Sequence, residues 1–100
     1  MVKHVVVWKL KDFAEGKSKA ENAQAMKSLL AGMQGKIPGL NHVEVGINIT
    51  KEQSDVDVVL FSEFGSLAEL DIYQNHPVHI AVKDFIGKVC TSRYVIDYEA

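Results

Sequence analysis

The sequence predicts an α+β domain in which a four-stranded antiparallel sheet carries helices on one face. Three observations support this fold class. Segments rich in β-branched residues alternate with segments of helical periodicity, two serine–glutamate pairs have the spacing of helix capping boxes, and the chain has only 100 residues. Because chains usually divide only beyond about 250 residues, we expect residues 1–100 to form a single domain.

The first element is a strand over residues 3–10, with the sequence KHVVVWKL. Alternation places His4, Val6 and Trp8 on one face of this strand, and Val5 and Val7 on the other. The uninterrupted apolar run at its centre indicates that both faces are covered. One cover is expected to be a helix layer, and the other a second sheet or a second subunit.

The longest helix is expected over residues 18–35. Ser18 and Glu21 fit a capping box, in which each side chain pairs with a free backbone amide of the first turn. Glycine and proline at Gly35, Pro38 and Gly39 end the helix. Apolar residues recur at steps of three and four and predict one buried stripe: Ala20, Ala23, Met26, Leu30, Met33 and Ile37.

Two strands, over residues 42–50 and 56–64, form a predicted hairpin around the polar turn TKEQSD. The inward side chains expected from the first of them are Val43, Val45, Ile47 and Ile49. Three acidic residues on or near the hairpin are interpreted as solvated charges: Asp55, Asp57 and Glu63.

The remaining elements complete the order β-α-β-β-α-β. Ser66 and Glu69 repeat the capping box and begin a helix that runs to about Asn75. Pro77 interrupts it, a second helical run follows over residues 78–88, and residues 91–98 form the last strand. This order is that of the ferredoxin-like, or split βαβ, arrangement.

A ferredoxin-like sheet has one face free of helices. Here that face carries Val5 and Val7, and a domain of this size hides little surface by itself. We therefore expect a homodimer in which the sheet faces of two chains pack together.

The composition of the chain limits which binding partners and which cellular compartment we expect. A net charge of −2 argues against a nucleic-acid partner, and the chain lacks the run of about 18 apolar residues that a membrane span needs. The single cysteine, Cys90, cannot form an internal disulfide, which favours the cytoplasm. No spacing of histidines and acids supplies a metal-ligand set, so we expect neither a metal nor a redox cofactor.

The segment from Tyr73 to His79, YQNHPVH, is the strongest candidate for a site. Helical spacing places Tyr73, His76 and His79 on roughly one side, with Pro77 bending the chain between them. The alternative interpretation is purely structural, with His76 as a polar cap at a helix end and Tyr73 half-buried.

His4 adds a further polar group on the face that the helices should cover. Together with Tyr73 and His79 it would form a small polar cluster in an apolar wall that includes Val6 and Trp8, a composition typical of a binding cavity. An imidazole is a competent base near neutral pH, and a phenol can hold or protonate an oxygen. The alternative is that His4 is a hydrogen-bonded core histidine.

The chain resembles the stress-responsive A/B barrel domain (Dabb) family over essentially its whole length. The matching residues are the opening VKHVV, the Tyr73-x-x-His76-Pro77-x-His79 segment and the closing VIDY. The resemblance implies a ferredoxin-like monomer that pairs sheet to sheet into a dimeric α+β barrel. In a plant polyketide cyclase of this family, the residues that match His79 and Tyr73 are the proposed base and its carbonyl-orienting partner, with the matches to His4 and His76 at or near the site.

Two functions are compatible with these features. The first is a cofactor-independent cyclase, lyase or isomerase, in which His79 removes a proton next to a carbonyl group, Tyr73 holds the oxygen and His4 or His76 orients them. The second is a non-catalytic homodimer that binds a small molecule or acts in a stress response. If a small carbonyl ligand binds, the residues expected to bind it beside the candidate catalytic groups are His76, Trp8 and Val6.

Overall fold

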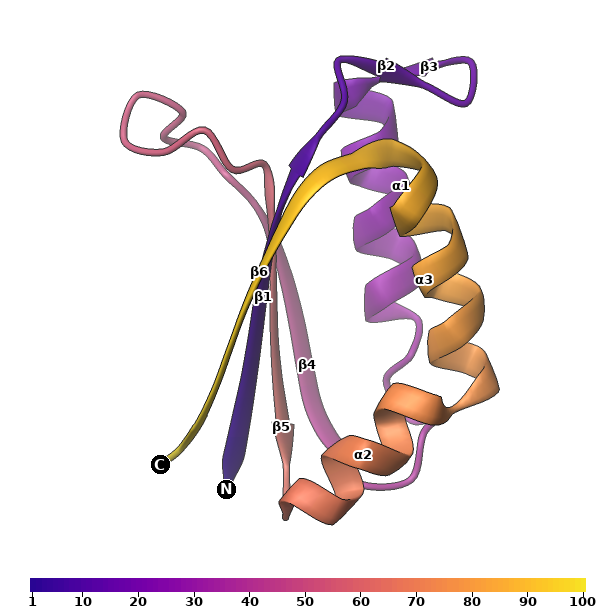
Figure 1. Cartoon of the computed structure of the whole chain (residues 1–100), viewed down its shortest axis with the longest axis vertical. Coiled ribbons are helices and arrows are strands. Elements are labelled where there is room, and N and C mark those ends of the chain that lie inside the picture. The colour runs from indigo at the N-terminus through magenta and orange to yellow at the C-terminus, as the bar shows by residue number, and fades with distance from the viewer.

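Four long strands form one antiparallel sheet, and three helices cover one of its faces, in the computed structural model of residues 1–100 (Figure 1). The strands lie in the spatial order β4-β5-β1-β6. The predicted ferredoxin-like fold is therefore confirmed. The sheet consists of β1 (Val2–Leu10), β4 (Leu40–Ile47), β5 (Val58–Phe64) and β6 (Cys90–Glu99), and the helices are α1 (Lys19–Ala31), α2 (Leu67–Asn75) and α3 (Pro77–Val89).

β1 lies between β5 and β6 and is antiparallel to both. Its even-numbered side chains are buried under the helices, whereas Val5 and Val7 on the opposite face are half-buried. The apolar core fills the space between the sheet and the helices. None of the helices is long and apolar enough to cross a membrane.

α1 begins with the predicted capping box. The Ser18 hydroxyl accepts a hydrogen bond from the Glu21 amide at 3.3 Å, and the Glu21 carboxylate accepts one from the Ser18 amide at 3.1 Å. The helix ends at Ala31, before the predicted end at Gly35, because turns follow and Gly35 adopts a φ of +82°. Met33 and Ile37 remain buried after the helix has ended.

The first predicted hairpin strand differs from β4 at both ends. Ile49, expected to point inward, is 92% exposed in the loop after β4. The Asn48 side chain explains this early end: its amide nitrogen donates to the carbonyls of Ser54 and Val56, and its oxygen accepts from the Thr50 amide. These bonds close a turn where an extended strand would otherwise continue.

A short strand pair before α1 was not predicted. β2 (Phe13–Ala14) and β3 (Lys17–Ser18) are joined by Glu15 and Gly16, both at positive φ. A two-residue turn of this kind favours a tight hairpin. It leads the chain from the sheet into α1.

The face of the sheet opposite the helices is open in the single chain (Figure 1). Large apolar side chains project from β6 on this face, with Tyr94 61% and Ile96 65% exposed. They lie opposite Val7 and Val5 in the register between β1 and β6. An open apolar face of this kind is typical of a surface that packs against another protein.

Candidate functional site

A cavity of about 220 Å³ lies between the sheet and the helices. Five of the six residues predicted for the site line it, namely His4, Val6, Trp8, Tyr73 and His79; His76 does not. The other lining residues are Leu30, Leu60, Lys83, Ile86, Gly87 and Arg93.

The elements that line the cavity place these side chains by simple periodicity. Alternation along β1 directs His4, Val6 and Trp8 toward the helices. On α3, His79 and Lys83 are one turn apart and share a face of the helix. The cavity therefore has a strand floor and a helical roof, and both are fixed by regular backbone hydrogen bonds.

His76 caps α3 at the junction between two helices. Its Nδ1 accepts a hydrogen bond from the Val78 amide at 3.1 Å, and Pro77 follows as the first helical residue. The capping bond fixes this ring at the helix junction, and His76 is not among the residues of the cavity wall. This differs from the binding role expected for His76 and is close to the structural alternative.

Tyr73 and His79 meet across this junction. Their ring centroids are 4.1 Å apart and their planes 30° apart, which is a stacked arrangement. The His4 ring stands edge-on to Tyr73, with a centroid separation of 5.9 Å. The break at Pro77 thus brings the end of α2 and the start of α3 together over β1.

His79 is held as a neutral base. Its Nδ1–H donates to the Gln74 carbonyl at 3.4 Å, which leaves the Nε2 lone pair free. Burial lowers the pKa of His79 to about 4, the Gln74 hydrogen bond opposes this, and the positive charges of Lys83 and Arg93 lower it further. The ring is therefore unprotonated at neutral pH.

His4 has a carboxylate partner on the neighbouring strand. Its Nδ1–H donates to Asp97 Oδ1 at 2.5 Å, and the register pairs these two residues directly across β1 and β6. Such a carboxylate fixes the tautomer and orientation of an imidazole and stabilises the imidazolium that forms when the ring accepts a proton. Asp97 could not be predicted as a site residue from the sequence. The alternation along β6 does not show that β1 is the strand beside it.

Two polar groups on the cavity wall have no hydrogen-bond partner: the Tyr73 hydroxyl and the Trp8 Nε1–H. Both side chains are buried, and a buried polar group without a partner destabilises a fold. Burial also raises the pKa of Tyr73, so its hydroxyl keeps the proton and remains a donor. The cavity therefore offers two unused donors to a ligand that carries acceptor oxygens.

Lys83 and Arg93 are cationic lining residues that sequence reasoning also missed. Lys83 could have been found from its helical spacing to His79, four residues earlier. Arg93 lies opposite Trp8 in the register between β1 and β6, which the local sequence does not reveal. Lys83 and Arg93 are both exposed, so they line the part of the cavity that faces solvent.

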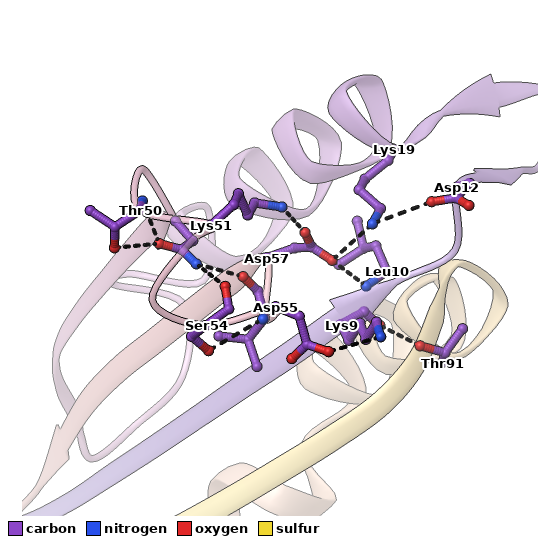
Figure 2. A network of polar contacts seen from close by, with 12 residues as sticks. Lys9, Leu10, Asp12, Lys19, Thr50, Lys51, Ser54, Asp55, Asp57 and Thr91 are labelled. Carbon is purple, nitrogen blue, oxygen red and sulfur yellow. Dashed lines mark hydrogen bonds and ion pairs between the residues drawn. The ribbon is translucent and has the colours of Figure 1, made fainter.

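Asp57 is not a solvated charge, and the prediction for it is wrong. It is only 1% exposed, and its carboxylate accepts a hydrogen bond from the Leu10 amide at 2.7 Å and one from Lys51 (Figure 2). Lys19 Nζ at the start of α1 lies 3.6 Å away. Burial acts to raise the pKa of Asp57, but these donors outweigh it and lower the pKa. This network fastens β1, β5 and α1 together and lies apart from the cavity described above.

A comparison with protein-family models identifies the family of this chain. The model of the stress-responsive A/B barrel domain matches residues 2–100. The chain belongs to this family. No curated protein matches the sequence.

Solved structures share the fold over nearly the whole chain. A dimeric ferredoxin-like protein of unknown function from Bacteroides fragilis is 30% identical, with a TM-score of 0.87 over 99% of this chain and 95% of that one. A Dabb family protein from Mesorhizobium loti is 25% identical, with a TM-score of 0.78 over 99% and 95%. A hydroxynitrile lyase from Passiflora edulis is 19% identical, with a TM-score of 0.76 over 97% and 90%, and shows likeness of fold alone.

Proposed function

We propose that the cavity binds a small carbonyl compound and that His79 removes a proton from the carbon next to the carbonyl group of this ligand. The observation that carries this proposal is the pairing of an unused buried donor, the Tyr73 hydroxyl, with the neutral His79 ring stacked against it. A proton acceptor beside an oxygen-binding donor is the arrangement that enolisation needs.

In this mechanism His79 Nε2 accepts the proton from the α carbon. The electron pair of the broken C–H bond forms the carbon–carbon double bond of the enolate, and the carbonyl π pair moves to the oxygen. The Tyr73 hydroxyl donates a hydrogen bond to that oxygen. His4, oriented by Asp97, lies edge-on to Tyr73 and supplies a second imidazole near the reacting atoms.

The enolate has two ordinary outcomes. When the substrate has a double bond between its β and γ carbons, return of the proton at the γ carbon is an isomerisation. Attack of the enolate carbon on a second carbonyl group of the same molecule, whose oxygen then takes up the proton, is an aldol cyclisation. Both need only the acid and base groups of Tyr73, His79 and His4. The volume of about 220 Å³ favours compact substrates.

Proton exchange in D₂O tests this function with the neutral methyl ketone 4-acetylbenzamide. We expect the wild-type protein to exchange the methyl protons about 10²- to 10⁴-fold faster than buffer, as a positioned general base does. His79→Gln and Tyr73→Phe should lose most of this acceleration. His42→Gln, which changes an exposed histidine on β4, is the control and should retain it.

Absence of exchange by the wild-type protein, for a ketone that binds, would contradict the catalytic proposal. The protein would then be a binding module, the second function compatible with its sequence. Equal loss of exchange in His42→Gln would show that the assay does not report on the cavity.

We also propose that two chains pair through the open faces of their sheets. The support is the exposed apolar surface of β6, formed by Tyr94 and Ile96 beside Val5 and Val7, and the dimeric state of the Bacteroides fragilis neighbour. Pairing would bury these side chains on the face of the sheet opposite the cavity.

A further inference from the structure

Two cations on the cavity wall have no acidic partner. Lys83 on α3 and Arg93 on β6 take part in none of the ion pairs of the chain, and no acidic side chain lines the cavity. The carboxylate of Asp97, four residues after Arg93 on β6, pairs with His4 instead. This end of the cavity therefore carries uncompensated positive charge.

An unused neutral donor lies at the same end. Trp8 is directly opposite Arg93 in the register between β1 and β6, and both residues line the cavity. The Trp8 side chain is 96% buried, and its Nε1–H has no acceptor in the chain. Because an indole N–H can only donate, its natural partner is an oxygen that accepts.

The other end of the cavity carries His4, Tyr73 and His79. His4 and Trp8 are four residues apart on β1, which separates their Cα atoms by about 13 Å at the usual rise of a strand. The wall between the two polar ends is apolar and includes Val6, Leu60 and Ile86. A cavity of about 150 Å³ holds benzene, so about 220 Å³ has room for a ring with short polar substituents.

We propose that the ligand of this cavity is a compact carboxylate whose anionic group is bound by Arg93, Lys83 and the Trp8 Nε1–H. The inference that Tyr73 binds a carbonyl group at the opposite end of the ligand depends on the proposed function. The inference of a carboxylate depends only on Trp8, Lys83 and Arg93. A guanidinium matches the two oxygens of a carboxylate, and hydrogen bonds between charged groups are shorter and stronger than neutral ones. Binding would satisfy both donors that the chain leaves unpaired.

Titration calorimetry at low ionic strength with two matched compounds tests this proposal. 4-Acetylbenzoate and 4-acetylbenzamide have nearly the same shape and the same methyl ketone, but only the first carries a charge. We expect the wild-type protein to bind the acid at least about tenfold more tightly than the amide, the ratio that one charge-assisted hydrogen bond supplies.

Substitution of the cations should remove this preference. Arg93→Gln and Lys83→Gln should each reduce the ratio of the two affinities several-fold, because the acid loses a charged partner and the amide does not. Both side chains are solvent-exposed, so both variants are expected to fold. Lys27→Gln removes the same charge from an exposed residue of α1 that lines no cavity, and should keep the wild-type ratio.

Trp8→Phe separates the role of the N–H from that of charge. It keeps an aromatic ring on the cavity wall and should weaken binding of the acid several-fold more than binding of the amide. Equal affinities for the two compounds in the wild-type protein would overturn the proposal. So would a preference that survives both cation substitutions, or failure of both compounds to bind at millimolar concentration.

The two proposals fail in different ways. If the acid is preferred but the wild-type protein exchanges no methyl protons, the anion site stands and the catalytic function falls. If 4-acetylbenzamide is exchanged but the acid has no advantage, the catalytic function stands and the anion site falls.

Discussion

The histidines show how local environment decides what one residue type does. His4 pairs with a carboxylate, His76 caps a helix, and His79 is buried with one ring nitrogen free. Only the first and third belong to the cavity. The neutral state of His79 at physiological pH follows from burial and from the nearby cations, which together disfavour the imidazolium.

The burial of His79 should be visible in its titration. The ring should titrate near pH 4, measured from its NMR resonances, because its pKa is lowered from 6.5 to about 4. Between these values the unfolded chain binds more protons than the folded one, so stability should rise with pH across this window. As the pH falls from about 6.5 to about 4, His79 should remove up to about 3 kcal/mol from the free energy of unfolding.

His79→Gln should abolish this part of the pH dependence, and the difference between the two proteins isolates it from titrating carboxylates. Chemical denaturation at several pH values measures the effect. Identical pH profiles for the two proteins would show that His79 is not held neutral by the fold.

The second prediction concerns Asp57. Asp57→Ala should lower the free energy of unfolding by about 2 to 4 kcal/mol at neutral pH, because it leaves the Leu10 amide and the Lys51 ammonium without a partner. Lys19 would keep only its ion pair with Asp12. Asp55→Ala removes an exposed ion pair with Lys9 from the same loop and should change stability far less, because solvent screens this pair. Equal losses in the two variants, measured by urea denaturation, would contradict the importance given to the Asp57 network.

Among the elements, those with strong local signals could be predicted from the sequence. The capping box at Ser18 and the alternation along β1 act over a few residues, and both appear in the structure. The end of β4 could not be predicted from alternation, because the Asn48 side chain closes a turn with residues beyond it. The same alternation does not show that the chain turns before Ile49.

The residues of the candidate site also differ in whether a local pattern could predict them. Residues on β1 and near the α2–α3 junction could be placed by periodicity, and His4, Tyr73 and His79 do line one cavity. Asp97 and Arg93 could not, because they join the site through the pairing of the first strand with the last. The burial of Asp57 could not be predicted for a similar reason, because it depends on contacts with Leu10, Lys19 and Lys51 from separate segments of the chain.

A prediction at the element scale concerns the turn before β4. Gly39 has a φ of +85°, and a Cβ there would lie 2.8 Å from Glu69 Cβ on α2. Gly39→Ala should therefore destabilise the protein by about 2 to 3 kcal/mol, through both backbone strain and steric overlap. Gly35→Ala has a similar φ of +82° but open space around it, and should cost only about 1 kcal/mol. Thermal melts of the two variants give the difference, and equal melting temperatures would contradict the close contact between this turn and α2.

At the scale of the whole molecule, the helices and the open sheet face divide the chain into a cavity side and an apolar side. The helices cover the first side and leave the second open in the single chain (Figure 1). The proposed dimer would therefore not compete with the cavity for the same surface.

One charge on the open face of the sheet should split the proposed dimer. Ile96→Asp should shift light scattering from the dimer mass toward about 11 kDa, because an unpaired charge buried at an interface costs several kcal/mol. Ile96 is 65% exposed in the single chain, so the monomer should remain folded. Ile72→Asp, at a 52% exposed position on α2, should stay dimeric. A wild-type protein that is monomeric at micromolar concentration would contradict the proposed pairing.

A crystal structure of the complex with 4-acetylbenzoate would show directly how the cavity binds a compact keto acid. The predicted result is a ligand inside the cavity, with its ketone oxygen within hydrogen-bonding distance of the Tyr73 hydroxyl and its methyl carbon facing His79 Nε2. Its carboxylate should lie between Arg93 and the Trp8 indole. A ligand bound outside this cavity, or an empty cavity in crystals soaked to saturation, would contradict both the proposed function and the anion site.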